Sequence, residues 1–372
     1  LEPDDDINLQ YTSGTTGFPK GVTLSHFNIL NNGYHVAKVM DFSEKDRLCI
    51  PVPFYHCFGM VMSNLSCVSF GATMVLPGYV FTPDSVLKAV ELEKCTALHG
   101  VPTMFIAELN DPGFANYDLS TLRTGIMAGA PCPIETMNST IEKMNMSQVV
   151  IAYGQTESSP VTTMTRIVDS VAKRVSTVGR VMPHQELKII DPLTGNTVAR
   201  GAQGEICFRG YNVMSRYYNN AEATRGAIDN SHWLHSGDLG VMDTEGYVKI
   251  TGRIKEMVIR GGENLYPREI EEFLHSNPDI MDVYVVGVPD IKYGEELMAW
   301  VLPMEGAQLT EEKIREFCKG KIAHFKIPRY FKFVASKDDF PMTVTGKIQK
   351  FKMREVAIVE LNLQAAANVE TA

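Results

Sequence analysis

Residues 11–21 read YTSGTTGFPKG, a stretch too rich in glycine, hydroxyl groups and charge for a hydrophobic core. Glycines let a backbone turn sharply and approach a ligand closely, while backbone N–H groups and hydroxyls face that ligand as donors. A polyphosphate has the acceptor oxygens that such a loop fits. The candidate phosphate-binding residues are Thr12, Ser13, Gly14, Thr15, Thr16, Gly17, Lys20 and Gly21.

The spacing of this loop excludes the P-loop of nucleoside triphosphatases. That pattern, G-x-x-x-x-G-K-[ST], would need a glycine at position 19 if it began at Gly14, and the chain has Pro19 there. A glycine-rich surface turn is the alternative for an isolated G-T-T-G. The length of the string and its lysine favour a phosphate loop of another kind.

The elements around the loop are predicted from hydrophobic periodicity. A strand-like run, 7–13, precedes it, and Ser25 is a plausible N-cap of a following helix. Phe27, Leu30, Tyr34 and Ala37 recur on one face of that helix. We therefore expect the loop to join a strand to a helix, with the positive helix N-terminus near the bound phosphate.

Strands and helices alternate between residues 47 and 154, which predicts an α/β fold with a mostly parallel sheet. Ligands of such sheets bind beyond the carboxyl ends of the strands. The stretches GAP (129–131) and YGQTE (153–157) both follow predicted strands, so we expect both at that edge. After about residue 175 short strands predict an antiparallel β region, and from Arg253 onward a smaller α+β unit follows.

Composition narrows the function classes. The 372-residue chain has a net charge of −9 and no basic block, which argues against a nucleic-acid partner. Seven scattered cysteines without metal-site spacing predict reduced thiols and a cytoplasmic location. Residues 48–83 carry no charge, but prolines and glycines interrupt them, so we expect a buried helix beside an apolar pocket and not a transmembrane segment.

Six stretches, in this order, resemble the motifs of the adenylate-forming (AMP-binding) superfamily, which includes acyl-CoA synthetases, firefly-type luciferases and the adenylation domains of peptide synthetases. They span nearly the whole chain. Within the superfamily the chain looks most like medium-chain acyl-CoA synthetases of the family-member-2 kind, through YGQTESSPVT, RGGENLYP and KGKIAHFKIPRY. The six stretches are YTSGTTGFPKG (11–21), PFYHCFG (53–59), YGQTE (153–157), HSGDLG (235–240), GRIKEMVIRGGENLYPREIE (252–271) and TVTGKIQK (343–350).

The resemblance implies an adenylate-forming fold in two parts. Residues 1–252 would form the large ATP- and acyl-binding domain without its leading portion, and residues 253–372 a small mobile C-terminal domain. The implied reaction activates a fatty acid with ATP and Mg²⁺ to acyl-AMP, releases pyrophosphate, and transfers the acyl group to CoA. The chain would be an acid–thiol ligase with small-molecule substrates.

The resemblance also assigns roles around the nucleotide. Glu157, with Thr12 nearby, would hold Mg²⁺, and Thr156 would contact the α-phosphate. Adenine would lie against the Tyr153 ring. The remaining contacts implied are the backbone of Gly129, Ala130 and Gly154 beside adenine, and Asp238 and Arg253 on the ribose.

Three further roles follow from the resemblance. His56 would be a gate beside the acyl carboxylate, with Phe54, Tyr55, Phe58 and Met60 in an apolar acyl tunnel. Lys347 would bridge the carboxylate and the α-phosphate as charge develops. The small domain would then swing about a hinge at Lys255, a position where the family has lysine or aspartate, and Gly261 and Gly262 would line the pantetheine channel.

Alternatives stay open at this point. The superfamily carries a long leading portion before the phosphate loop, so the chain is a fragment or another polypeptide supplies that mass. An adenylation domain feeding a carrier protein, a luciferase-type oxygenase and a non-catalytic nucleotide-binding protein share the same loops. The acyl chain length is not fixed by the sequence, and a homodimer is one assembly that it allows.

Overall fold

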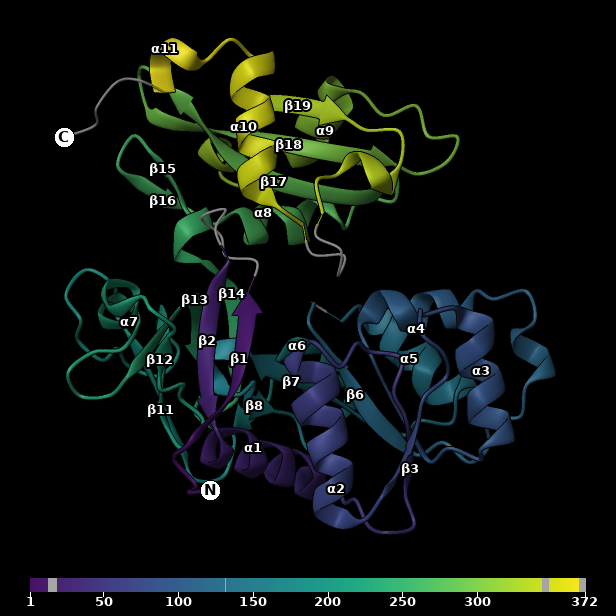
Figure 1. Ribbon diagram of the computed structural model, residues 1–372. Helices are drawn as coiled ribbons and strands as arrows, with labels where there is room; N and C mark the ends of the chain where they lie inside the picture. Colours follow the sequence, from purple (N-terminus) through teal and green to yellow (C-terminus); the bar gives the residue numbers. More distant parts are fainter. Residues whose placement is uncertain (13–18, 131, 343–347, 368–372) are drawn as a thin grey trace. The chain divides into compact units, whose positions relative to one another are not determined.

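The computed structural model describes residues 1–12, 19–130, 132–342 and 348–367 (Figure 1). The described residues form two compact units. The first contains 1–12, 19–236 and 240–250, and the second contains 237–239 and 251–367 apart from the undescribed gap. The sequence-based boundary between residues 252 and 253 and the hinge near Lys255 stay predictions.

A seven-stranded sheet organises the first unit, in the order β4-β3-β5-β6-β7-β8-β9. The strands from β4 to β7 are parallel, and β8 and β9 are antiparallel, which confirms the mostly parallel sheet. The strands are β3 (Arg47–Cys49), β4 (Thr73–Val75), β5 (Ala97–Gly100), β6 (Thr124–Ala128), β7 (Gln148–Gly154), β8 (Val161–Met164) and β9 (Arg180–Val181).

Helices cover both faces of this sheet. Successive residues of a strand point to opposite faces, so Ile126 packs in one hydrophobic cluster and Met127 in the other. One face is covered by α3 (Pro83–Leu92), α4 (Pro102–Leu109) and α5 (Ile134–Lys143), and the other by α1 (His26–Val39), the π-helix η1 (Phe58–Leu65) and α2 (Ser66–Phe70).

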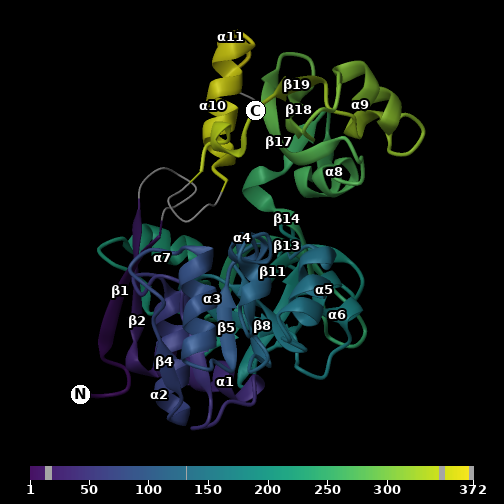
Figure 2. The same cartoon turned by 90° about the vertical axis from the view of Figure 1, so that its right-hand side faces the viewer.

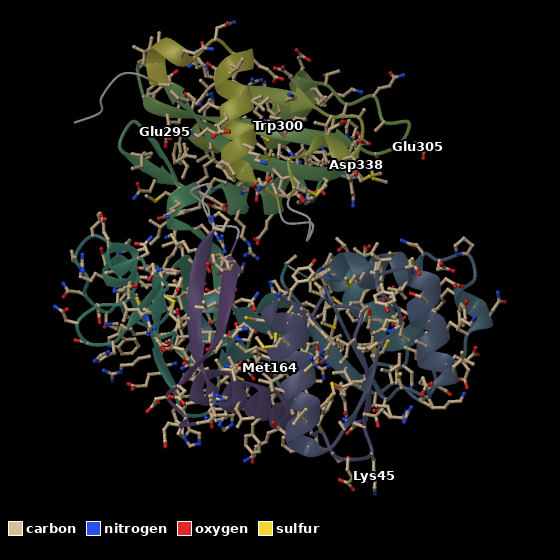
Figure 3. All side chains as sticks on the ribbon, in the orientation of Figure 1. Lys45, Met164, Glu295, Trp300, Glu305 and Asp338 are labelled. Atoms are coloured by element: carbon tan, nitrogen blue, oxygen red, sulfur yellow. The ribbon has the colours of Figure 1, made fainter. Side chains whose placement is uncertain are left out.

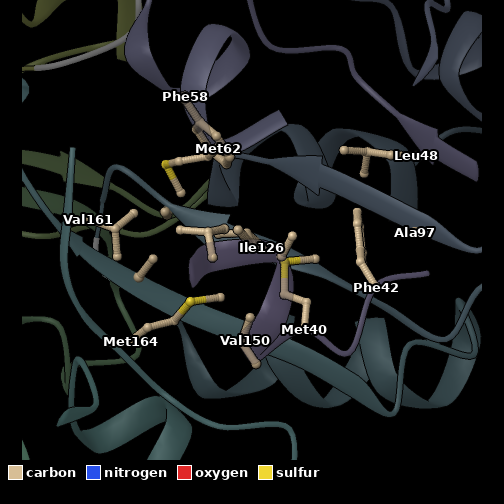
Figure 4. Close-up of a cluster of buried hydrophobic side chains, with 14 of the residues drawn as sticks. Met40, Phe42, Leu48, Phe58, Met62, Ala97, Ile126, Val150, Val161 and Met164 are labelled. Carbon is tan, nitrogen blue, oxygen red and sulfur yellow. The ribbon is translucent and has the colours of Figure 1, made fainter. Parts of the chain in front are cut away.

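Part of the uncharged segment 48–83 lies within this core. Leu48, Phe58 and Met62 pack with Ile126 and Val150 on one face of the sheet (Figure 4). The expected buried helix is confirmed, although its first half is a π-helix. Among the described residues, the structure contains no helix long and apolar enough to cross a membrane.

A separate three-stranded sheet corrects the expected surroundings of the phosphate loop. Strand β1 (Asp6–Thr12) pairs antiparallel with β2 (Lys20–Ser25), which pairs in turn with β12 (Arg216–Tyr217). The loop therefore joins two strands, and the prediction that it joins a strand to a helix is wrong. Ser25 caps α1 as expected. However, the strand between Lys20 and α1 is about 20 Å long, so the N-terminus of α1 lies too far from the loop to act on a phosphate there.

The buried face of α1 also differs from the expected one. Phe27, Leu30 and Tyr34 are exposed, and of the predicted stripe only Ala37 is buried. The buried face includes Asn32, whose amide donates to the carbonyl of Val161 at 2.8 Å and accepts from its N–H at 3.1 Å. Paired hydrogen bonds let a polar residue occupy the sheet-facing side of the helix.

The antiparallel β region is a four-stranded sheet in the order β10-β11-β13-β14, as expected from the short strands after residue 175. Strands β10 and β11 form an antiparallel pair. Its strands are β10 (Gln185–Ile190), β11 (Gln203–Gly210), β13 (Leu234–Met242) and β14 (Val248–Arg253). Outside this sheet, the chain also forms α6 (Val171–Ser176), α7 (Ala221–Ala227) and the short helices η2 (Phe114–Asn116) and η3 (Thr156–Ser158).

The second unit is built on the predicted hairpin of β17 (Ile280–Asp290) and β18 (Gly294–Pro303). Figure 2 shows α10 and α11 on one side of its sheet and α8 and α9 on the other. Trp300, labelled in Figure 3, is buried against α10. The other elements are β15 (Val258–Arg260), β16 (Glu263–Leu265), β19 (Tyr330–Phe333), α8 (Pro267–Leu274), α9 (Glu311–Cys318), α10 (Lys350–Glu360), α11 (Gln364–Ala367), η4 (Ile254–Glu256), η5 (His324–Lys326) and η6 (Lys337–Asp339).

Candidate functional site

The described ends of the phosphate loop lie beside each other. Thr12, the last residue of β1, is the register partner of Lys20, the first residue of β2. An open pocket of about 340 Å³ adjoins them. The predicted residues Ser13, Gly14, Thr15, Thr16 and Gly17 lie outside the described residues. The pocket is lined by Tyr11, Pro19, Lys20, Gly21, Tyr217, Tyr218, Asn219 and Asn220.

Glu157 is held at the same end of the first unit. It follows β7 on the short helix η3, which is capped by reciprocal hydrogen bonds between Gln155 and Ser158. The hydroxyl of Tyr217 donates to Glu157 Oε1 at 2.8 Å. The Nζ atom of Lys20 lies 4.8 Å from the centroid of the Tyr217 ring. A single tyrosine thus connects the predicted metal ligand with the predicted phosphate-binding lysine.

The donors at this point fit a magnesium ion. Mg²⁺ in nucleotide sites binds one or two carboxylates and takes its remaining ligands from water and phosphate oxygens. Glu157 supplies a half-buried carboxylate. Thr12 supplies a hydroxyl at the end of β1, and Thr156 a second one beside Glu157 on η3. These three side chains offer hard oxygen atoms, which suit Mg²⁺ better than softer metals.

The predicted adenine contacts lie at the carboxyl ends of two neighbouring strands. Strands β6 and β7 are parallel, with Ala128 opposite Ala152, so Gly129 and Ala130 leave the sheet beside Tyr153 and Gly154. The Tyr153 ring packs edge-on against Phe208, with centroids 6.0 Å apart. The structure therefore brings the two stretches to one edge, as the parallel order required.

We expect Gly154→Ala to disorder this edge. A Cβ atom at Gly154 would lie 1.8 Å from the carbonyl oxygen of Pro160, a backbone atom that cannot move aside without shifting the turn after η3. The variant should lose nucleotide affinity and melt at a lower temperature, as measured by nucleotide titration and thermal unfolding. Gly226→Ala is the matched control, because its Cβ would meet open space. Parent-like affinity and melting in Gly154→Ala would contradict this geometry.

The two predicted ribose contacts form an ion pair in the second unit. Arg253 Nε lies 2.8 Å from Asp238 Oδ1, and the side chain of Asp238 is only 5% exposed. The pair joins β13 to β14, so the arginine holds the carboxylate in one orientation. The sequence identified both residues but gave no sign that they contact each other.

His56 is exposed two residues before η1, and its Nδ1 accepts from the N–H of Phe58 at 3.1 Å. Phe58 is buried in the core, and Phe54 and Tyr55 are exposed. The acyl tunnel and the gate role of His56 stay predictions. The π-helix that follows is a conformation often found at functional sites.

The residues predicted for the second half-reaction lie in the second unit. Lys255 is exposed on η4, and Gly261 and Gly262 have φ values of 58° and 90° in the turn between β15 and β16, which favours glycine. Lys347 lies outside the described residues. Lys350, three positions on, forms ion pairs with Glu256 at 3.1 Å and Glu271 at 2.7 Å, a link that the sequence did not indicate.

Glu205, Cys207 and His235 form a group of metal-ligating side chains on β11 and β13. His235 Nδ1 lies 2.9 Å from Glu205 Oε2, the distance of an ordinary hydrogen-bonded pair. Burial raises the pKa of the Cys207 thiol to about 12, so the thiol stays protonated. A hydrogen-bonded pair of His235 and Glu205 beside a buried thiol accounts for this group without a metal.

Comparisons with known proteins match most of this chain. A family model described as "AMP-binding enzyme" matches residues 1–218, and one described as "AMP-binding enzyme C-terminal domain" matches residues 269–347. YngI of Bacillus subtilis, which carries the name of an acyl-CoA synthetase, is 58% identical over 98% of this chain and 66% of its own length. The medium-chain acyl-CoA ligase ACSF2, mitochondrial, of Danio rerio is 48% identical over 97% of this chain and 59% of its own length. The chain thus spans about three fifths to two thirds of the curated relatives it matches.

Solved structures show the same fold. ATP-bound MatB from Rhodopseudomonas palustris is 33% identical with a TM-score of 0.86, over 96% of this chain and 69% of that one. The o-succinylbenzoate CoA synthetase MenE from Bacillus subtilis, in complex with an acyl-adenylate, is 29% identical with a TM-score of 0.83, over 95% and 70%. The predicted adenylate-forming fold is confirmed.

Proposed function

We propose a function for this chain from one premise: it belongs to the family of AMP-binding enzymes, whose models match well over half of its length. We infer that its activity is that of an AMP-forming fatty acid–CoA ligase. The observation that supports the proposal most strongly is that Lys20 and Glu157 both contact Tyr217 at the base of the phosphate loop.

The proposed reaction has two steps. A carboxylate oxygen attacks the α-phosphorus of ATP, the bond to the bridging oxygen breaks, and pyrophosphate leaves with that electron pair. The sulfur of CoA then attacks the acyl carbon, and AMP leaves with the former carboxylate oxygen. Positioning and charge stabilisation supply most of the catalysis of such phosphoryl chemistry.

Each group has a role in the first step. Lys20 and the loop hold the β- and γ-phosphates, and Thr156 contacts the α-phosphate. Glu157, with Thr12, would hold Mg²⁺, which neutralises charge on the phosphates when bound. Asp238, oriented by Arg253, accepts the ribose hydroxyls.

The substrate and acceptor are proposed from the relatives. The ACSF2 proteins are named as medium-chain acyl-CoA ligases, which supports a medium-chain fatty acid and CoA here. McbA from Marinactinospora thermotolerans, with a TM-score of 0.82, is named as an amide bond synthetase, so the acceptor needs its own test. A cytoplasmic location and a homodimer stay predictions, and the ACSF2 names place those relatives in mitochondria.

A pyrophosphate-release screen tests the proposal. Because the curated relatives are longer, we would add to this chain the part of YngI that lies outside its matched region, and we call the product the extended protein. Straight-chain acids of increasing length should give a maximum at medium length, and CoA should accept the acyl group better than amines or a carrier protein. ATP binding without pyrophosphate release from any acid would mean a non-catalytic nucleotide-binding protein.

Asp238→Asn is expected to raise the KM for ATP by about 10- to 100-fold, since a charged hydrogen bond to the ribose is replaced by a neutral one and the ion pair with Arg253 loses its negative charge. Steady-state kinetics at varied ATP measures the change. Glu186→Gln breaks the exposed ion pair with Arg209 on neighbouring strands and should leave this KM unchanged. An unchanged KM in Asp238→Asn would remove Asp238 from the nucleotide site.

A further inference from the structure

We propose that Tyr217 is a positioning residue of the nucleotide site, whose hydroxyl fixes the Glu157 carboxylate and whose ring fixes the Lys20 ammonium. The proposal rests on the function proposed above, because it assigns a task at the phosphate end of the same site. None of the six motifs contains Tyr217.

The backbone around Tyr217 is anchored to the strand that begins with Lys20. Tyr217 on β12 is the register partner of Val22 on β2. The N–H of Tyr218 donates to the carbonyl of Gly21 at 2.7 Å, next to Lys20. The N–H of Tyr217 donates to Thr224 Oγ1 at 3.0 Å, which ties β12 to α7. The tyrosine is therefore fixed relative to the start of β2.

The same segment holds Glu157 at two points. The N–H of Met214 donates to the backbone carbonyl of Glu157 at 2.9 Å, and the Tyr217 hydroxyl donates to its Oε1 at 2.8 Å. An ionised carboxylate accepts only, so the phenolic proton must point at Glu157. One orientation of the Glu157 carboxylate is thereby selected.

The ring acts on Lys20 in a different way. A cation near an aromatic face is attracted without being neutralised, whereas a carboxylate partner would compete with a phosphate for its charge. Among the ion pairs of the described residues, none includes Lys20, and its ammonium lies 4.8 Å from the ring centroid. Tyr217 thus restrains the lysine and leaves its full positive charge for an anion.

Burial of Tyr217 makes both contacts rigid. The residue is 7% exposed and packs in a cluster with Val22, Cys57 and Met214. A rigid phenol that donates a hydrogen bond to a metal-binding carboxylate orients that carboxylate. Loss of such a hydrogen bond lowers metal affinity or activity by about 10- to 100-fold. We therefore expect the affinity for the metal ion to be the property most affected by the loss of Tyr217.

Tyr217→Phe tests the hydroxyl and keeps the ring. In the extended protein with a non-hydrolysable ATP analogue, Mn²⁺ titration followed by electron paramagnetic resonance should show metal binding weakened by about 10- to 100-fold. Affinity for the analogue without metal should stay that of the parent. Tyr217→Leu should in addition weaken metal-free analogue binding, because Lys20 loses its ring.

Tyr211→Phe is the matched control, since Tyr211 is a partly buried tyrosine of the same unit whose hydroxyl contacts Gln185 instead. It should leave metal binding unchanged. A Tyr217→Phe titration that overlays the parent's overturns the proposal, whatever happens to the melting temperature. Because this readout needs no turnover, a protein that binds Mn²⁺ and the analogue but never releases pyrophosphate would refute the proposed function and still test Tyr217.

Discussion

Lys347→Ala is expected to lower the rate of ATP–pyrophosphate exchange by about 10²- to 10³-fold, the usual cost of removing one fixed donor from a site of developing charge. The carboxylate and the α-phosphate repel each other as they meet, and the ammonium group of Lys347 would offset that repulsion. The residues next to the undescribed segment are held in the second unit. Met342 and Ile348 form a β-bridge, and Lys350 is paired with Glu256 and Glu271.

The two half-reactions separate this role from a loss of folding. Attack of CoA on a supplied acyl-adenylate should survive in Lys347→Ala, because the carboxylate and the α-phosphate are already joined by a covalent bond there, so the repulsion between them no longer has to be overcome. Lys352→Ala, an exposed lysine on α10, should leave both half-reactions unchanged. Equal loss of both half-reactions in Lys347→Ala would contradict the assignment.

Glu157→Gln is expected to reduce the rate of ATP–pyrophosphate exchange by about 10²-fold or more and to raise the magnesium concentration that the exchange requires. Replacement of metal ligands or of groups that stabilise charge typically lowers activity by such factors. Glutamine has nearly the same shape and its amide oxygen still accepts from Tyr217, so packing is retained while the charge for Mg²⁺ is lost. A magnesium titration of the exchange rate measures the effect.

The control for Glu157→Gln is Glu142→Gln, an exposed glutamate on α5. It should leave the magnesium titration unchanged. Thermal unfolding of both variants should match the parent, which would assign the loss to chemistry. A Glu157→Gln variant with the parent's magnesium requirement would remove Glu157 from the metal site.

The sequence predicted the parallel sheet and the β17–β18 hairpin well, because both rest on short-range periodicity. The closeness of Gly129–Ala130 to Tyr153–Gly154 could be predicted from the parallel order of β6 and β7 alone. The neighbourhood of the phosphate loop was predicted wrongly, since residues 20–25 form a strand with no turn signal between it and α1. Where a strand leads directly into a helix, no turn residues mark the boundary between them in the sequence.

Other features depend on tertiary contacts that no local pattern reports. Periodicity found an apolar stripe on α1, but the buried Asn32 shows that hydrogen bonding decided which stripe faces the sheet. Tyr217 and Glu157 are 60 positions apart, and their contact requires β12 to pair with β2. The Asp238–Arg253 pair likewise requires β13 to lie beside β14.

The fate of the carboxylate oxygen tests the central claim most directly. A fatty acid labelled with ¹⁸O in its carboxylate would be converted by the extended protein with ATP, Mg²⁺ and CoA, and the products analysed by mass spectrometry. If the acid attacks the α-phosphorus, the AMP released must carry one labelled oxygen, and pyrophosphate must carry none. Unlabelled AMP, or label in inorganic phosphate with ADP as product, would show that no acyl-adenylate forms and would contradict the account.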